Sequence, residues 1–123
     1  MMKNLYKQDL MDHYQNPKNF GALQDPCLVS ERLNPSCGDT VLFAVRVDQG
    51  IIQDVRFTGK GCVLSIAAAS KLSEFVKGQP AQHIAQLDQQ FMQELVGMQV
   101  GFSRMQCITL SLQALVSALK KGD

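Results

Sequence analysis

The sequence predicts a single α+β domain in which a small three-stranded antiparallel sheet packs against helices. Between residues 28 and 59 apolar side chains alternate with polar ones, which is the period of sheet strands. After residue 61 apolar side chains recur every three or four positions, which is the period of an α-helix. Strands that precede most of the helices, without an internal repeat or a linker, are typical of the α+β class. We therefore expect residues 1–123 to form one domain.

The N-terminal segment has apolar side chains at helical spacing. Tyr6, Leu10 and Tyr14 lie four residues apart, which predicts an amphipathic helix over residues 3–14. The helix should end just before Pro17, because the residue that precedes a proline disfavours the helical conformation. The turn-rich sequence that follows is interpreted as an irregular connector.

Three consecutive segments are predicted to form an antiparallel meander. Residues 28–33 are interpreted as a short strand, and residues 40–48 alternate strictly between apolar and other side chains. Residues 51–59 alternate again after a turn with the sequence DQG. The predicted apolar face of this last strand contains Ile51, Val55 and Phe57.

The second half of the chain is predicted to be helical. The segment that starts at Cys62 should form a helix ended by Gly78, and Pro80 should start a short helix through about Leu87. Asp88 is a suitable N-cap for residues 89–96, and Gly97 should end that helix. In the last helix, Ser103 and Gln106 match the S-x-x-Q capping box, and an apolar stripe extends from Met105 to Leu119.

Composition and charge exclude several classes of function. The net charge is +1, with 12 basic and 11 acidic residues in both halves of the chain, so no electrostatic footprint for nucleic acid is expected. No apolar run approaches the roughly 20 residues of a membrane span, and the polar N-terminus is not a secretory signal. We expect a cytoplasmic protein with reduced thiols. Separately, we interpret the two histidines, His13 and His83, as surface positions.

Four cysteines in such a compartment favour metal or sulfur chemistry over disulfides. Cys37 lies in a turn before a predicted strand, Cys62 follows the sequence GKG between a strand and a helix, and Cys107 is placed in the first turn of the last helix. A helix N-terminus favours anions and so lowers a thiol pKa, an effect that nearby Lys60 and Arg104 would strengthen.

The ordinary alternatives remain open for each of these residues. A lone cysteine is more often a small buried apolar residue than a ligand, which is our interpretation of Cys27. Asp39 alone is more often a turn residue or a cap, and there is no CxxC pair of the kind found in zinc ribbons. A site made by Cys37, Asp39, Cys62 and Cys107 would nevertheless offer three soft thiolates and one hard carboxylate, a set that suits Zn²⁺ or iron in a cluster.

At these residues the sequence resembles the U-type iron–sulfur cluster assembly scaffold family, which includes proteins of the NifU N-terminal, IscU and SufU type. The resemblance lies in NPSCGD, in GKGC followed by SIAAAS, in a third cysteine at the start of the last long helix, and in LYKQDLMDHYQNPKNFG at the N-terminus. It covers nearly the whole chain and implies the α+β fold predicted above.

The resemblance also implies an activity. Cys37, Cys62 and Cys107 would be cluster and sulfur ligands, and Asp39 the labile fourth ligand. A cysteine desulfurase would deliver persulfide sulfur, with Cys62 or Cys107 as the first acceptor, and an iron donor would supply the metal. A transient [2Fe-2S] cluster would form and pass to apo-proteins, or Zn²⁺ would occupy the same site. On this hypothesis the chain is a binding protein rather than a self-contained enzyme.

Departures from the family pattern favour its Suf-type branch. Gln106 stands where the better-known branch has histidine, and GMQVGFSRMQC replaces the Leu-Pro-Pro-Val-Lys segment that a dedicated Hsp70 chaperone reads, so that partner is not implied. Arg104 stands three residues before the third cysteine, as an arginine does in the Suf-type branch. The usual insertion of that branch is absent. Members of the branch are also zinc-dependent sulfur acceptors that stimulate a desulfurase without building a cluster, which is our second hypothesis. A structural zinc domain with an unrelated binding role is the third.

Overall fold

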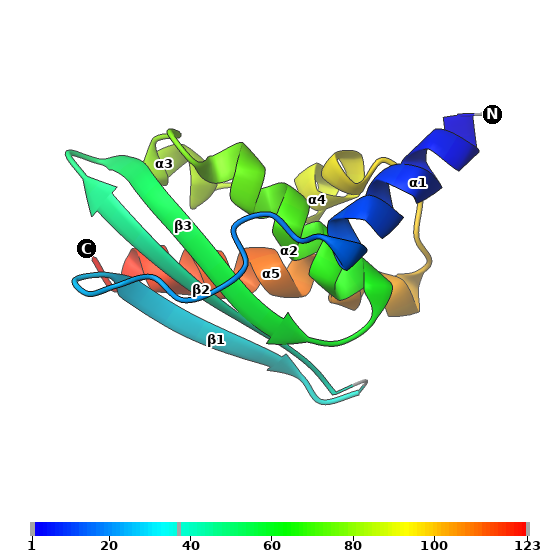
Figure 1. Cartoon of the computed structure of the whole chain (residues 1–123), viewed down its shortest axis with the longest axis horizontal. Helices are drawn as coiled ribbons and strands as arrows, with labels where there is room; N and C mark the ends of the chain where they lie inside the picture. Colours follow the sequence, from blue (N-terminus) through cyan, green and yellow to red (C-terminus); the bar gives the residue numbers. More distant parts are fainter. Residues whose placement is uncertain (1, 37, 123) are drawn as a thin grey trace.

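A three-stranded antiparallel sheet and two long helices form the body of the structure, which is a computed structural model (Figure 1). It describes the backbone of residues 2–36 and 38–122, and the side chains of these residues from residue 7 onward. The predicted α+β class is confirmed. In chain order the elements are α1 (Met2–Gln15), β1 (Leu28–Asn34), β2 (Asp39–Asp48), β3 (Ile51–Lys60), α2 (Val63–Val76), α3 (Ala81–Ile84), α4 (Gln89–Val96) and α5 (Phe102–Lys120).

The strands form the predicted meander, in the order β1-β2-β3. A two-residue turn joins β2 to β3, and Gln49 and Gly50 in it have φ values of 53° and 79°. Positive φ at both central residues matches the right-handed twist of the strands on either side. The predicted DQG turn is therefore confirmed.

A β-bulge corrects the predicted apolar face of β3. Arg46 pairs with Asp54 but Val47 pairs with Ile52, so Gln53 is an extra residue without a counterpart in β2. A bulge reverses the alternation of side chains on its far side. Val55 and Phe57 are fully buried as predicted, whereas Ile52 replaces Ile51 in the core.

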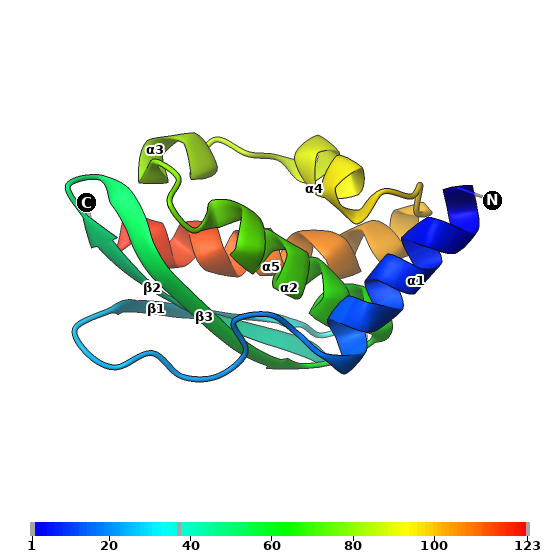
Figure 2. The same ribbon diagram turned by 45° about the horizontal axis from the view of Figure 1, so that its top comes forward.

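Helices α2 and α5 cover one face of this sheet, as Figure 2 shows from a second direction. Helix α5 packs against β1 and β2, and α2 packs against β3 and against α5. The predicted stripe of α5 is largely buried, although Met105 and Val116 are only half-buried at its margin. The largest side chains that are fully buried between the layers include Phe43, Phe57, Ile52, Leu72, Ile108 and Leu115.

Helix α1 packs on α2 and ends at Gln15, just before Pro17, as predicted from that proline. Leu10 is buried as expected, but Tyr14 is exposed and His13 is buried. The prediction that His13 is a surface residue is therefore wrong. The imidazole is accommodated because α2 offers it a polar partner: Nδ1 lies 2.6 Å from the Ser70 hydroxyl. His83 is exposed, as predicted.

Single residues in the sequence correctly predicted both ends of α4, but not the end of α3. The Phe91 N–H donates to the Asp88 side chain at 3.1 Å and Gly97 has φ 84°, so both predicted ends of α4 are confirmed. Helix α3 is shorter than predicted, because the N–H groups of Gln86 and Leu87 donate to the third residue before them, as in a 3₁₀ turn.

The end of α2 is likewise determined by residues that are close together in the sequence. The helix ends at Val76, and the next turn is closed by a hydrogen bond from the Gln79 N–H to the Val76 carbonyl. Gly78 has φ 87° in this turn, a conformation that glycine adopts without strain. Within the described residues, no helix has the length and apolar character that crossing a lipid bilayer requires.

Because of the bulge, alanine substitutions at two neighbouring isoleucines should lower the free energy of unfolding by different amounts. Ile52→Ala should lower the free energy of unfolding by about 2–5 kcal/mol, because it removes a fully buried side chain from the core. Ile51→Ala should lower the free energy of unfolding clearly less, since Ile51 is only half-buried. Urea unfolding of the two variants measures the difference, and equal costs would contradict the register described here.

Candidate functional site

Three side chains from separate elements meet at one end of the molecule. Asp39 is the first residue of β2, Cys62 directly precedes α2, and Cys107 lies in α5. One ligand atom of each lies within 4.8 Å of the other two. Figure 1 shows why they meet, because β2, α2 and α5 all begin at the same end of the body. The structure thus brings together three of the four predicted site residues, and the fourth, Cys37, lies outside the described residues.

The Asp39 carboxylate accepts hydrogen bonds on both oxygens. Oδ1 accepts from the Cys62 backbone N–H at 3.1 Å, and Oδ2 accepts from the Ser65 hydroxyl at 2.5 Å and from the Cys62 thiol at 3.6 Å. The carboxylate therefore sits at the N-terminus of α2, where unpaired N–H groups and the helix dipole stabilise negative charge. These contacts compensate for its burial, since Asp39 is only 2% exposed.

Two glycines allow this close approach. A Cβ atom on Gly61 would lie 2.4 Å from the Asp39 Oδ1, and one on Gly59 would lie 2.6 Å from the Thr40 carbonyl oxygen. Real Cβ atoms do not occur at such distances, so any larger residue would displace the carboxylate or the strand. Gly59 and Gly61 therefore permit the close packing of the backbone next to Cys62.

The two described cysteines of the site differ in their surroundings. Cys62 is exposed and stands at the N-cap position of α2, as predicted. Cys107 is 8% exposed, and the prediction that it lies in the first turn of its helix is wrong. Helix α5 starts at Phe102 with Gly101 as its N-cap, so the Ser103–Gln106 capping box does not form and Cys107 falls in the second turn. The capping signal failed because the Gly101 carbonyl already accepts from residues 104 and 105.

The donor atoms fit a metal ion. Zinc binds thiolate sulfur at about 2.3 Å and carboxylate oxygen at about 2.1 Å, so these two ligands lie about 3.6 Å apart in a tetrahedral site. The Asp39 Oδ2 and the Cys62 Sγ are 3.6 Å apart. Asp39 and Cys62 therefore present one hard and one soft donor at the spacing that a single ion requires, and Cys107 offers a second soft donor within 4.8 Å of both.

Cys27 is separate from this site. It is half-buried rather than packed in the core, and it lines a groove at the β2–β3 turn and the C-terminal end of α5. Burial raises the pKa of the Cys27 thiol, and the nearby Asp25 carboxylate raises it further, while Arg46 acts in the opposite direction. Its thiol therefore carries less thiolate than an ordinary cysteine at neutral pH.

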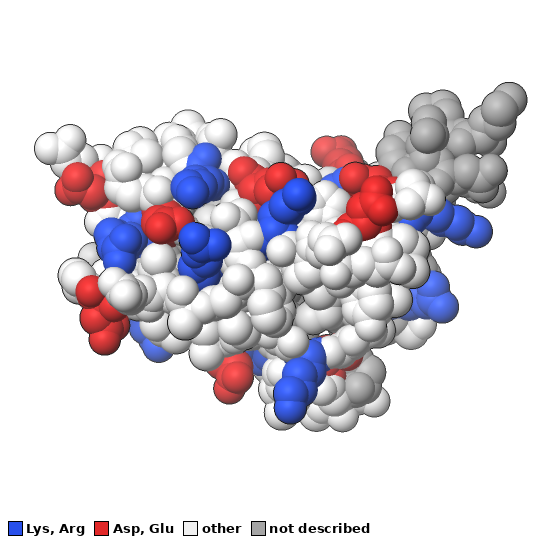
Figure 3. Space-filling view, viewed as in Figure 1, with Lys and Arg blue, Asp and Glu red and all other residues white. Residues whose placement is uncertain are grey.

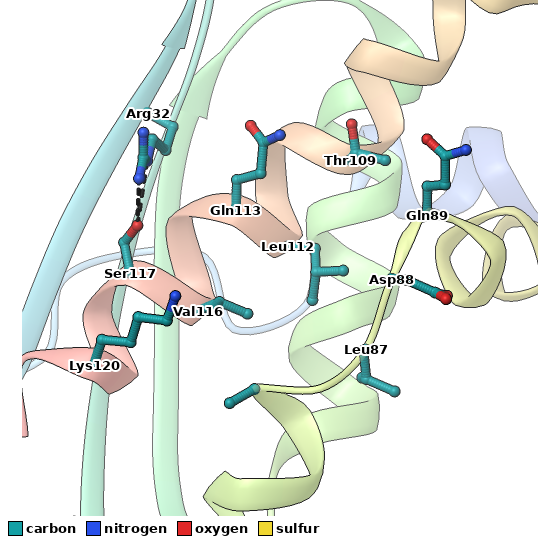
Figure 4. Close-up of a pocket in the computed structure, with 11 residues that line it drawn as sticks. Arg32, Leu87, Asp88, Gln89, Thr109, Leu112, Gln113, Val116, Ser117 and Lys120 are labelled. Atoms are coloured by element: carbon teal, nitrogen blue, oxygen red, sulfur yellow. Dashed lines mark hydrogen bonds between the residues drawn. The ribbon is translucent and has the colours of Figure 1, made fainter. Parts of the chain in front are cut away.

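A second groove, of about 400 Å³, lies between α5, β1 and the segment that joins α3 to α4 (Figure 4). The Arg32 guanidinium donates to the Ser117 hydroxyl from Nε at 3.2 Å and from Nη2 at 2.7 Å. The groove was not predicted from the sequence, because its lining mixes polar residues with apolar ones such as Leu87 and Leu112 and comes from separate parts of the chain. None of the three described cysteines lines it.

The surface shown in Figure 3 carries no large patch of one charge. Lysine and arginine side chains are interspersed there with aspartate and glutamate. This mixture agrees with the near-neutral net charge of the sequence. On this face, charge does not indicate a polyanionic ligand.

The sequence matches the NifU-like N terminal domain family over residues 5–122. The chain belongs to this family. It is 31% identical to the zinc-dependent sulfurtransferase SufU of Bacillus subtilis, in an alignment that covers 99% of this chain and 94% of the relative. It is 38% identical to the iron–sulfur cluster assembly scaffold protein IscU of Aquifex aeolicus, with 94% of this chain and 74% of the relative covered.

Solved structures are similar to this NifU-like domain. A scaffold assigned to the SUF system of Fervidobacterium islandicum AW-1 has a TM-score of 0.75 at 25% identity, and the match covers 91% of this chain and 94% of that one. A crystal structure of a hypothetical protein has a TM-score of 0.83 at 27% identity, with 96% and 98% covered. The alignment with the Bacillus subtilis relative spans 139 residues, 16 more than this chain contains, which agrees with the predicted lack of an insertion.

The close approach at Gly61 leads to a stability prediction. Gly61→Ala should lower the free energy of unfolding of the metal-free protein by about 2–3 kcal/mol, because its Cβ would displace the Asp39 carboxylate. Gly101→Ala is the control, since a Cβ there meets nothing within 4 Å, and it should cost less than about 1 kcal/mol. Urea unfolding compares the two, and a Gly61 variant as stable as the Gly101 variant would contradict the geometry.

The raised pKa of Cys27 predicts slow alkylation. In a Cys37→Ser, Cys62→Ser, Cys107→Ser variant, the only remaining thiol should react with iodoacetamide more slowly at pH 7 than a cysteine in a short unstructured peptide. The thiolate is the reacting form, so the rate should keep rising beyond about pH 8.5, the ordinary thiol pKa. A midpoint at or below that of the peptide would refute the expected direction.

Proposed function

We propose that this chain is an iron–sulfur cluster assembly scaffold. It accepts sulfur from a cysteine desulfurase, binds iron, and assembles a transient [2Fe-2S] cluster that passes to apo-proteins. The observation that carries the proposal is the meeting of Asp39, Cys62 and Cys107 at one end of a NifU-like domain. The iron and the cluster are cargo on this proposal, and an iron donor and the acceptor proteins are further partners.

The proposed ligands are Cys37, Asp39, Cys62 and Cys107. Cys37 is included because it precedes Asp39 by two residues in the sequence NPSCGDT. The thiolates are the soft ligands that iron–sulfur clusters use. Asp39 is a harder and weaker ligand for such a centre, and it already has hydrogen-bond donors that can hold its carboxylate when the cargo leaves.

Sulfur transfer requires an accessible thiolate. The Cys62 thiolate would attack the terminal sulfur of the desulfurase persulfide, which forms a persulfide on Cys62 and releases the desulfurase cysteine as a thiolate. Cys62 is the better first acceptor because it is exposed and stands at a helix start, whereas Cys107 is buried in the second turn of α5. Reduction of this sulfur to the sulfide of a cluster needs a separate electron donor.

A second candidate function is zinc-dependent sulfur transfer without cluster assembly. Two observations favour it. The Asp39–Cys62 spacing of 3.6 Å suits Zn²⁺, and the Bacillus subtilis relative that is named a zinc-dependent sulfurtransferase aligns with 99% of this chain. In this case Zn²⁺ would be held by the same four residues and would keep their thiols in the thiolate form.

Anaerobic reconstitution tests the proposed ligands. Incubation with iron, cysteine and a cysteine desulfurase should produce visible cluster absorption, and Cys37→Ser, Cys62→Ser or Cys107→Ser should each reduce the absorption several-fold. Cys27→Ser is the matched control and should behave as the unchanged protein, because Cys27 lies outside the site. Absorption that survives all three site substitutions would rule the proposal out.

Metal analysis and desulfurase turnover separate the two candidate functions. The scaffold predicts a cluster that transfers to an apo-ferredoxin, with or without zinc in the protein as purified. The sulfurtransferase predicts desulfurase stimulation that is lost on zinc removal and no cluster under any condition. Unfolding of the chelated protein would instead favour a structural zinc site.

A further inference from the structure

We propose that Ser65 is a positioning residue of this site, whose hydroxyl holds the Asp39 carboxylate in the orientation that binds a metal. The proposal rests on the proposed function, because it takes Asp39 as a ligand. Ser65 is the third residue of α2 and is fully buried. The sequence did not indicate a role for it, since a serine in SIAAAS is compatible with an ordinary small residue in a packed helix.

Ser65 contacts two of the proposed ligands at once. Its hydroxyl donates to the Asp39 Oδ2 at 2.5 Å and lies 3.5 Å from the Cys62 Sγ. Oδ2 is also the carboxylate oxygen that the Cys62 thiol contacts, at 3.6 Å. The hydroxyl therefore stands beside the two donor atoms that an ion would join, without being one of the donors in the proposed set.

The hydrogen bonds of Asp39 fix the rotation of its carboxylate. The Cys62 N–H holds Oδ1 and the Ser65 hydroxyl holds Oδ2, so a turn about the Cβ–Cγ bond would break both contacts. When Cys62 binds an ion as a thiolate, its S–H no longer donates to Oδ2, and Oδ2 can then bind the ion beside the Cys62 sulfur while it still accepts from Ser65. Loss of the hydroxyl would remove the 2.5 Å contact that holds Oδ2, so Oδ2 would be a less well-defined ligand.

The size of the effect follows from the behaviour of residues that orient metal ligands. Loss of a hydrogen bond to a ligating group typically costs 10- to 100-fold in metal affinity. We expect Ser65→Ala to weaken Zn²⁺ binding about tenfold, as measured by competition with a chromophoric chelator. Alanine is small and favours helices, so the fold of α2 should be preserved, which circular dichroism of the metal-free variant checks.

A double-mutant cycle distinguishes positioning from general destabilisation. If Ser65 acts through Asp39, then Ser65→Ala should have no further effect on Zn²⁺ affinity in an Asp39→Ala background. Ser65→Thr keeps the hydroxyl and should stay within about threefold of the unchanged protein. Ser111→Ala is the matched control, because Ser111 is a fully buried helical serine whose hydroxyl donates to the Ile108 carbonyl, and it should leave the affinity unchanged.

The visible spectrum of the Co²⁺-substituted protein gives a readout that is independent of affinity. In Ser65→Ala it should shift toward the spectrum of Asp39→Ala, because the oxygen ligand is less firmly held. The proposal fails if Ser65→Ala binds Zn²⁺ as tightly as the unchanged protein, if the loss persists in the Asp39→Ala background, or if Ser65→Thr loses as much affinity as Ser65→Ala. If Asp39→Ala and Cys62→Ser themselves leave Zn²⁺ affinity unchanged, the proposed metal site is wrong, whatever Ser65 does.

Discussion

The hydrogen bonds accepted by Asp39 connect the start of β2 to the start of α2, and the geometry of the site depends on them. A buried carboxylate is costly unless donors surround it, and here the donors are a backbone N–H at a helix start and the Ser65 hydroxyl. The same bonds fix the direction in which the chain leaves β3 and enters α2. Glycine is required at position 61, between β3 and α2, because a side chain there would occupy the place of the Asp39 carboxylate.

Cys107, the third described member of the proposed ligand set, is positioned by packing rather than by a local contact. Helix α5 is held against β1, β2 and α2 along most of its length, so Cys107 is carried into the site by the core of the protein. Buried residues such as Ile108 and Leu115 anchor the turns that follow it. A site on the ends of packed elements is more rigid than one on long loops, and metal ligands require that rigidity.

Much of this arrangement could be predicted from side-chain periodicity and turn residues, which are local properties. The strands, the long helices and the ends of α4 follow from such signals. Two of the errors concern contacts between elements: Gln53 has no counterpart in β2, and His13 is buried against Ser70 of α2. The third is local, since Gly101 rather than Ser103 is the N-cap of α5. Sequence motifs indicated the proposed ligands of the site. Ser65 was missed because its partner lies 26 residues away in the sequence.

The position of Cys107 in the last helix also has a consequence during synthesis. Asp39, Cys62 and Ser65 lie at the starts of β2 and α2, which only β3 separates in the chain. The ribosome adds Cys107, the third described member of the proposed ligand set, 45 residues after Cys62. Synthesis runs from the N-terminus, and domains generally fold as units. A growing chain therefore lacks Cys107 while the first two described members of the proposed set are already made, and the three donors come together only when α5 docks on the sheet.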